Sequence, residues 1–254
     1  MSISTNLRLF LLLSVFAATL CIAEEETTVQ ASFINDMIDA FGQPLLDLGW
    51  EKDNDQYCKF EGVACDDGSI FELKLPNRSL NGTLPDSIAK LSRLEALELP
   101  HNNISSIPQV GSNHFYYLDM SNCNISGTFP ESINVPYLKT INLSSNNLEG
   151  NLGEQTLNYK AITNLVLNNN SLSGSLPNSL TDASHLYRLD LSYNKFTGGV
   201  PSGIAKLPYL EILQLHHNNL DSLSSDFDSS QIKDFKFDPQ SVQSNSRRSR
   251  RGRV

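Results

Sequence analysis

The sequence has few tryptophans, methionines and cysteines, and it lacks the motifs typical of active sites. Its 254 residues include one tryptophan, three methionines and four cysteines. It contains no G-x-S-x-G, H-E-x-x-H, P-loop, G-x-G-x-x-G or C-x-x-C pattern, so the common signatures of hydrolases, metalloproteases, nucleotide binding and dithiol redox chemistry are missing. His216 and His217 are adjacent, and on a strand their side chains would point to opposite faces, which argues against a catalytic or metal-binding pair. We therefore expect neither an enzyme nor a resident cofactor or metal.

Long hydrophobic runs are also scarce, and the one clear example lies at the N-terminus. Residues 9–20 are apolar, Arg8 precedes them, and small residues ending at Ala23 lead into three glutamates. This layout is typical of a secretory signal peptide, so we predict one over residues 1–23 with cleavage after Ala23. An uncleaved anchor helix is the alternative. With no second apolar run, we expect no transmembrane segment beyond the signal peptide and a location outside the cell, secreted or at the cell wall or cell surface.

Charge of one sign dominates the body of the chain. Without Arg8 the formal net charge of −9 becomes −10, and setting aside the five arginines within residues 247–253 leaves about −15 for residues 24–246. An acidic body is a poor partner for nucleic acid, so none is expected. Residues 241–254 lack apolar periodicity and should form a disordered tail. The tail could be a dibasic processing site, a contact for an acidic polysaccharide, or an inert solvated end.

The cysteines agree with export. Cys58 and Cys65 are seven positions apart in the sequence, and we predict a disulfide between them. A zinc site is the alternative, but no second pair of Cys or His residues sits at ligand spacing. Cys123 should be a buried, unreactive thiol.

Six Asn-x-Ser/Thr triplets are candidate glycosylation sites. Their asparagines are Asn77, Asn81, Asn103, Asn124, Asn142 and Asn169.

A pattern of the form L-x-x-L-x-L-x-x-N-x-L-x-G-x-L-P recurs along the chain. Its seven clear copies begin near Ile70, Leu94, Phe115, Leu138, Ile162, Leu186 and Leu210. A fixed period of 21 to 24 residues with this pattern is the signature of a leucine-rich-repeat solenoid. The leucines alternate inward on short strands that stack into a concave parallel sheet, and the asparagines turn inward to bond the backbone of neighbouring coils. The fold class is therefore an α/β repeat.

The ends of the solenoid need separate cover. Residues 24–69 should form a helical N-terminal cap bonded by the disulfide. The repeats then span residues 70–240, because Ile232 to Phe237 repeats the strand spacing with aromatic residues and predicts a degenerate eighth strand.

These motifs resemble the plant-type extracellular leucine-rich-repeat proteins, which include the ectodomains of receptor-like proteins and receptor kinases and the polygalacturonase-inhibiting proteins. The motif L-x-G-x-L-P stands at residues 80–85 and 172–177, and Trp50, Cys58 and Cys65 are placed as in the family's cap. The chain departs from the family at Phe60, where tryptophan is usual, and it lacks the paired C-terminal cysteines.

The resemblance and the solenoid together favour binding over catalysis. We expect a secreted or cell-surface recognition protein that binds an extracellular protein or peptide partner through its concave face, in signalling or defence. The alternatives are an inhibitor of a wall-degrading glycosidase and a structural cell-surface or wall glycoprotein. Interface anchors favour Tyr and Arg, and the outward strand positions supply the candidates. They are Tyr117, Asp119, Arg188, Asp190, Tyr193, Gln214 and His216.

Overall fold

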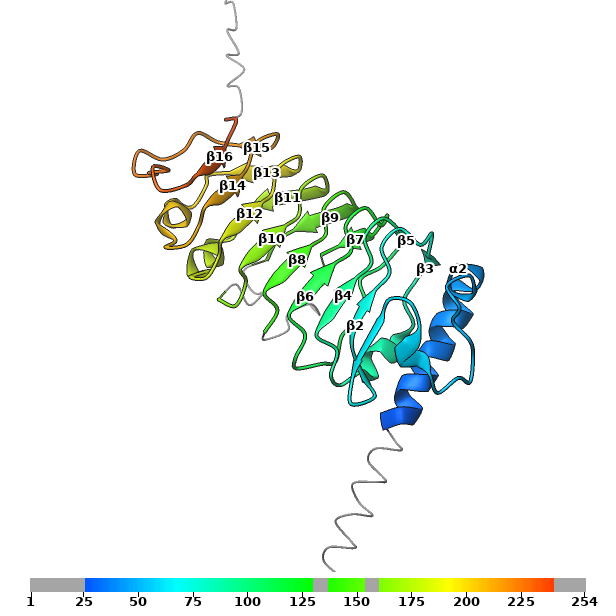
Figure 1. Cartoon of the computed structure of the whole chain (residues 1–254). Coiled ribbons are helices and arrows are strands. Elements are labelled where there is room, and N and C mark those ends of the chain that lie inside the picture. The colour runs from blue at the N-terminus through cyan, green and yellow to red at the C-terminus, as the bar shows by residue number, and fades with distance from the viewer. Residues whose placement is uncertain (1–25, 130–136, 154–159, 240–254) are drawn as a thin grey trace, which may run out of the picture.

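The computed structural model describes residues 26–129, 137–153 and 160–239. The predicted signal peptide and the predicted arginine-rich tail lie outside these ranges. Within them the chain forms a solenoid whose coils lie side by side along one axis, with the helical cap at the N-terminal end (Figure 1). The predicted solenoid with a parallel sheet and a disulfide-bonded cap is confirmed.

A nine-stranded sheet runs the length of the molecule and presents the concave face. Its order is β1-β2-β4-β6-β8-β10-β12-β14-β16; β1 and β2 pair antiparallel, and every later pair is parallel. The strands are β1 (Val63–Asp66), β2 (Ser69–Lys74), β4 (Ala96–Glu98), β6 (Tyr117–Asp119), β8 (Thr140–Asn142), β10 (Asn164–Val166), β12 (Arg188–Asp190), β14 (Ile212–Gln214) and β16 (Asp234–Lys236).

The period-two alternation of the repeat produces this sheet. The middle residues of successive strands, such as Leu97, Leu165 and Leu189, are fully buried, while their neighbours on the strand face outward. Each buried leucine contributes about 2 kcal/mol of hydrophobic free energy. The pairing keeps equivalent positions in line, so Arg188 lies opposite Ile212 and Asp190 opposite Gln214. Outward side chains of neighbouring repeats therefore form continuous rows.

A second, smaller sheet follows the first, and the sequence pattern does not predict it. Its order is β15-β13-β11-β9-β7, and β3 pairs separately with β5. Gly150 and Gly174 have φ of +81° and +79°, a left-handed conformation that favours glycine where the chain turns. The strands are β3 (Asn81–Gly82), β5 (Asn103–Ile104), β7 (Ser126–Thr128), β9 (Asn147–Asn151), β11 (Ser171–Ser175), β13 (Lys195–Gly198) and β15 (Asn219–Leu220).

Short 3-10 helices return the chain to the large sheet. They are η2 (Asp86–Lys90), η4 (Asn178–Asp182) and η5 (Ser202–Lys206). Each follows a proline that serves as its N-cap residue. Proline has no backbone N–H, but the helix does not use an N–H at this position, so no hydrogen bond is lost. Five residues of tight helix fit the length left in a repeat of 24 residues.

Inward asparagines join the coils, as the repeat predicts, and we call this row of side chains the ladder. Asn146 Nδ2 donates to the carbonyls of Met120 at 2.9 Å and Leu143 at 3.0 Å, while its Oδ1 accepts from the amides of Cys123 and Ile125. One side chain thus satisfies four backbone groups that would otherwise be buried without partners. Four further asparagines donate in the same way to carbonyls of their own and of the preceding coil, and each accepts from at least one backbone amide. These are Asn102, Asn170, Asn194 and Asn218.

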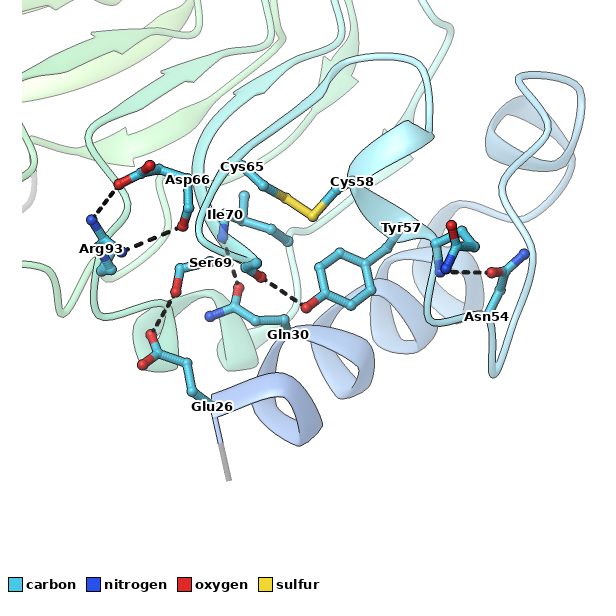
Figure 2. Close-up of a disulfide and its surroundings, with 12 residues drawn as sticks. Glu26, Gln30, Asn54, Tyr57, Cys58, Cys65, Asp66, Ser69, Ile70 and Arg93 are labelled. Atoms are coloured by element: carbon cyan, nitrogen blue, oxygen red, sulfur yellow. Dashed lines mark hydrogen bonds and ion pairs between the residues drawn. A yellow bond between two sulfur atoms is a disulfide. The ribbon is translucent and has the colours of Figure 1, made fainter. Parts of the chain in front are cut away.

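The N-terminal cap consists of a helix over residues 26–41, α2 (Gln43–Leu46), and η1 (Tyr57–Lys59) beside β1. The Cys58–Cys65 disulfide is present, with the two Cα atoms 5.6 Å apart (Figure 2). Gln30 Oε1 accepts from the backbone N–H of Ile70 across the first coil, and the hydroxyl of Tyr57 donates to the carbonyl of Gly68. The cap therefore covers the apolar end of the solenoid and is joined to the first coil by these hydrogen bonds.

Aromatic residues cover the opposite end. β16 pairs with β14 within the segment for which the sequence predicts an eighth strand. Phe235 stacks on Phe227 with ring centroids 5.8 Å apart and on Phe237 at 6.4 Å, and all three rings pack against the core.

Candidate functional site

The candidate residues lie on two separate parts of the concave face. Arg188, Asp190 and Gln214 lie on β12 and β14, and Tyr193 and His216 follow those strands directly. Tyr117 and Asp119 lie on β6, three strands from β12 in the sheet order. At the usual spacing of neighbouring strands this separation is about 14 Å. The structure therefore brings five of the seven predicted residues together over β12 and β14.

On β6, the polar side chains are largely occupied by their neighbours. Asp119 accepts hydrogen bonds from the Ser121 hydroxyl at 2.7 Å, from the Ser121 amide and from the Asn142 side chain at 3.1 Å. Burial raises the pKa of the Tyr117 phenol, and the charges of Asp119 and Glu98 raise it further. This part of the face is stabilised from within the fold, which leaves its carboxylate fewer free positions for a ligand.

On β12, an ion pair lies along the strand. Arg188 Nη2 donates to Asp190 Oδ2 at 3.1 Å, and the carboxylate also accepts from the Ser192 hydroxyl at 2.7 Å. Asp190 is 7% exposed, whereas the Arg188 side chain is 41% exposed. The buried carboxylate thus holds an accessible guanidinium at the surface of the face.

Three buried polar atoms of this region have no partner among the described residues. They are Gln214 Oε1, His216 Nδ1 and Arg188 Nε. Gln214 is 5% exposed, and its Nε2 donates to the carbonyl of Asp234, so only its acceptor end is unsatisfied. Buried polar groups without partners are uncommon and costly, which marks this cluster as unusual for a strand surface.

Tyr193, His216 and His217 form an aromatic cluster at the end of these strands. The Tyr193 ring centroid lies 5.2 Å from that of His216 and 4.3 Å from that of His217. The expectation that the two imidazoles point to opposite faces is wrong, because their centroids are 5.2 Å apart. Both residues lie beyond the end of β14, and His217 has a φ of 54°, so strand alternation does not apply to them. The Asp238 carboxylate accepts from the His217 amide at 2.7 Å.

The sequence reasoning missed Asp238 as a member of this cluster, because Asp238 comes from the next, degenerate repeat. Of the six predicted glycosylation asparagines, only Asn142 is not exposed; it is half-buried on β8, and its amide donates to Asp119.

Other kinds of site find little support in the part of the chain that the structure describes. Nowhere in it do three or more His, Cys, Asp or Glu side chains gather closely enough to hold a metal ion. Within the same ranges, no helix is both long and apolar enough to cross a membrane. The described concave face offers charged, hydrogen-bonding and aromatic groups, and these suit the binding of a partner.

The parallel coils, the inward asparagines and the cap define a leucine-rich-repeat protein, and family comparisons agree. Models described as "Leucine rich repeat" and "Leucine Rich Repeat" match residues 160–220 and 114–135. The chain is 40% identical over 97 residues to Receptor protein kinase WSS1 of Oryza sativa subsp. japonica, covering 37% of this chain and 10% of that protein. It is 35% identical over 103 residues to Receptor-like protein 50 of Arabidopsis thaliana, covering 37% and 12%.

Solved structures place the fold in the same group. The crystal structure of PEPR1-AtPEP1 aligns with a TM-score of 0.68 at 25% identity, over 85% of this chain and 31% of that chain. The BIR3–SERK2 complex from Arabidopsis thaliana aligns with a TM-score of 0.53 at 28% identity, over 75% and 94%. The chain thus has the repeats and the fold of leucine-rich-repeat proteins and is similar to the ectodomains of plant receptors. It spans 10% to 12% of the length of the two sequence relatives.

Proposed function

We propose that this chain is a recognition protein that binds an extended peptide or protein segment on the concave face over β12, β14 and β16, in signalling or defence outside the cell. The observation that carries the proposal is the cluster of unpartnered polar atoms on Gln214, His216 and Arg188. These atoms lie on neighbouring strands, beside an exposed tyrosine and an accessible guanidinium.

The free-energy cost of leaving these polar atoms unpaired favours the binding of a ligand that can pair with them. An unsatisfied buried donor or acceptor costs about 1–3 kcal/mol, and a ligand that lets the side chain turn toward it removes that cost. Gln214 Oε1 needs a donor, such as a peptide N–H, and Arg188 Nε needs an acceptor, such as a peptide carbonyl. A polypeptide carries both groups at regular spacing, which makes it the class of ligand that suits the cluster.

The aromatic cluster supplies the apolar part of the contact. Tyr193 is 48% exposed and contacts two imidazoles, which hold its ring in place before a ligand arrives. Ordered tyrosines of this kind are enriched among the residues that dominate interface energies. We expect a side chain of the ligand, apolar or aromatic, to contact this ring.

The relatives support a role in ligand binding without naming the ligand of this chain. Phytosulfokine receptor 1 of Arabidopsis thaliana is 36% identical over 85 residues, and its name describes a receptor. The BIR3–SERK2 structure is a complex of two proteins. Binding of a peptide or of a second protein is therefore the activity that we carry over to this chain as a proposal.

Selection from a displayed library of random peptides against the secreted full-length chain tests the proposal. We expect selected peptides to lose about tenfold or more in affinity when Arg188→Ala or Gln214→Met is introduced. The matched control is Lys195→Ala, an exposed residue of the same coil that lies on β13 in the other sheet. Equal affinities for the Arg188 variant, the Gln214 variant and the wild type would place recognition elsewhere.

The two alternative functions give different results in the same system. Loss of activity of a wall-degrading glycosidase on mixing with the chain would support the inhibitor. Retention on insoluble polysaccharide, with no peptide selected, would support the structural glycoprotein. Either outcome without a dependence on Arg188 and Gln214 would overturn the proposal.

A further inference from the structure

A second surface of the molecule, distinct from the concave face, carries most of its exposed aromatic side chains. Tyr116, Tyr137, Tyr187 and Tyr209 lie just before strands β6, β8, β12 and β14, and we call this surface the tyrosine edge. They account for four of the six large apolar or aromatic side chains that are exposed in the described residues. Tyr116 and Tyr187 directly precede their strands, and Tyr137 and Tyr209 stand three residues before theirs, so two repeat positions supply this surface. Exposed aromatic side chains gathered in this way form a surface that folding alone does not require.

The tyrosine edge is hollowed at one place. Two adjacent coils border an open cavity of about 450 Å³ lined by Asn113, His114, Tyr116, Tyr137 and Lys139. Sites for small ligands commonly have volumes of about 300–1,000 Å³. Tyr137 is 61% exposed, so its ring stands at the mouth of the cavity and not in the core. The size suits one or two sugar rings or a side chain of a partner.

The backbone around the cavity offers little to an extended peptide. The Tyr116 carbonyl already accepts from the amides of Lys139 at 2.9 Å and Thr140 at 3.1 Å. The Tyr116 amide donates to Glu95, and the Lys139 carbonyl accepts from Thr163. A strand added at this edge would therefore find these main-chain groups occupied. Recognition here has to use side chains.

Those side chains have a consistent chemistry. All five described lining residues carry hydrogen-bonding groups, namely an amide, an imidazole, two phenols and an ammonium, on side chains that also present apolar ring and methylene surface. The electron-rich face of a tyrosine ring attracts polarised C–H groups and cations, while its hydroxyl donates and accepts hydrogen bonds. A ligand that suits this set has flat C–H faces bordered by many hydroxyls, which describes a pyranose ring.

The charge of the cavity adds a further requirement. Among the described residues Lys139 takes part in no ion pair, although the chain has a net charge of −9. An ammonium without a carboxylate partner beside two exposed phenols is complementary to an anionic group on the ligand. We propose that the cavity at the tyrosine edge binds an oligosaccharide that carries an acidic group, a carboxylate or a sulfate. This site is independent of the peptide-binding face.

Titration calorimetry with three saccharides tests the proposal on the secreted full-length chain. The probes are trigalacturonic acid, which carries carboxylates, a sulfated heparin tetrasaccharide, and uncharged maltotriose. We expect at least one acidic probe to bind and maltotriose to bind at least about tenfold more weakly. The stronger acidic probe identifies the anionic group. Equal binding of all three, or binding of none, would overturn the proposal.

Substitutions locate the site. Tyr137→Ala and Lys139→Gln should each weaken binding of the acidic probe by about tenfold, since each removes one of the two main contacts. Tyr209→Ala is the matched control, because Tyr209 precedes its strand at the same repeat position and is 63% exposed, but it does not line the cavity. Equal losses from Tyr137→Ala and Tyr209→Ala would mean a diffuse aromatic surface and would contradict a defined site.

The arginines of residues 247–253 need a control of their own, because they also attract acidic sugars. In the full-length chain with these arginines changed to glutamine, binding should persist and should still depend on Tyr137 and Lys139. Complete loss of binding in that variant would assign the interaction to the tail and would overturn the proposed site. Unchanged thermal melting curves show that the variants remain folded, as expected for exposed side chains.

Discussion

The thiol of Cys123 lies 3.1 Å from the carbonyl oxygen of Leu99, at the repeat position that asparagine occupies in neighbouring coils. Burial raises the pKa of the thiol, and the backbone amides of Asn102 and Ile104, which interact with its sulfur, lower it by less, so the thiol stays protonated and can donate. The equivalent amides of the next coil donate to Asn146 Oδ1. One cysteine thus substitutes for an asparagine with weaker bonds of the same pattern.

Substitution of Cys123 should show how much these bonds contribute. Cys123→Val keeps the apolar volume but leaves two buried amides without an acceptor, so the free energy of unfolding should fall by about 2 kcal/mol. Cys123→Asn restores the stronger acceptor and should be neutral or stabilising by about 1 kcal/mol. Urea denaturation measures both values. A valine variant as stable as the wild type would show that sulfur plays no part in the ladder.

Removal of a ladder asparagine should cost more than removal of a surface one. Asn194 donates to the carbonyls of Leu167 and Leu191 and accepts from the Leu172 amide at 3.0 Å. Asn194→Ala should therefore lower the free energy of unfolding by about 3 kcal/mol. Asn219→Ala, at an exposed position on β15, is the control and should change it by less than about 0.5 kcal/mol. Similar losses in urea denaturation would contradict the ladder.

The cap disulfide should stabilise the chain by a modest amount. The loop between Cys58 and Cys65 is short, and the chain-entropy estimate for a bridge of that size is about 2.5 kcal/mol. Cys58→Ser and Cys65→Ser, singly or together, should lower the urea midpoint equally, because either change removes the same covalent bond. A single variant much less stable than the double variant would point to an unpaired thiol that damages the cap.

Tyr117 should make the fold sensitive to high pH. Its pKa is raised by burial and then by Asp119 and Glu98, so the unfolded chain ionises this phenol first. The contribution of the neutral Tyr117 phenol to the free energy of unfolding is fully present below its pKa in the unfolded chain, about 10. This contribution is lost as the pH rises from there through its pKa in the folded chain. We expect Tyr117→Phe to flatten this decline in urea midpoints between about pH 9 and pH 11. An identical decline in both proteins would exclude Tyr117 as its source.

The sequence predicts the large sheet and the buried ladder well, because both depend on residues that recur at fixed spacing. Leucines and asparagines at these positions have no other arrangement that buries the one and satisfies the other. The position of Cys123 within the core could be read from the same register. The same register shows that Cys123 stands in place of the repeat asparagine. The hydrogen bond of its thiol to Leu99 could not be predicted, because it depends on the distance between coils.

The smaller sheet and the aromatic clusters escape prediction for physical reasons. Ser126 to Thr128 are all exposed and pair through backbone groups, so β7 leaves no apolar alternation in the sequence. The approach of His216 and His217 depends on a left-handed turn beyond the strand. The tyrosine edge becomes visible only when residues from different repeats are stacked in space.

Among the described residues, the coil that contains β16 is held by a neighbouring coil on one side only. β16 pairs with a single neighbour, β14, in the described part of the chain, whereas interior strands pair with two. In a solenoid each coil is held by its neighbours, so an end coil separates most readily. Gln214 and His217 use β16 and Asp238 as partners, so part of the recognition face depends on the coil that is held from one side only. A ligand that contacts β14 and β16 together would therefore also oppose the separation of this coil.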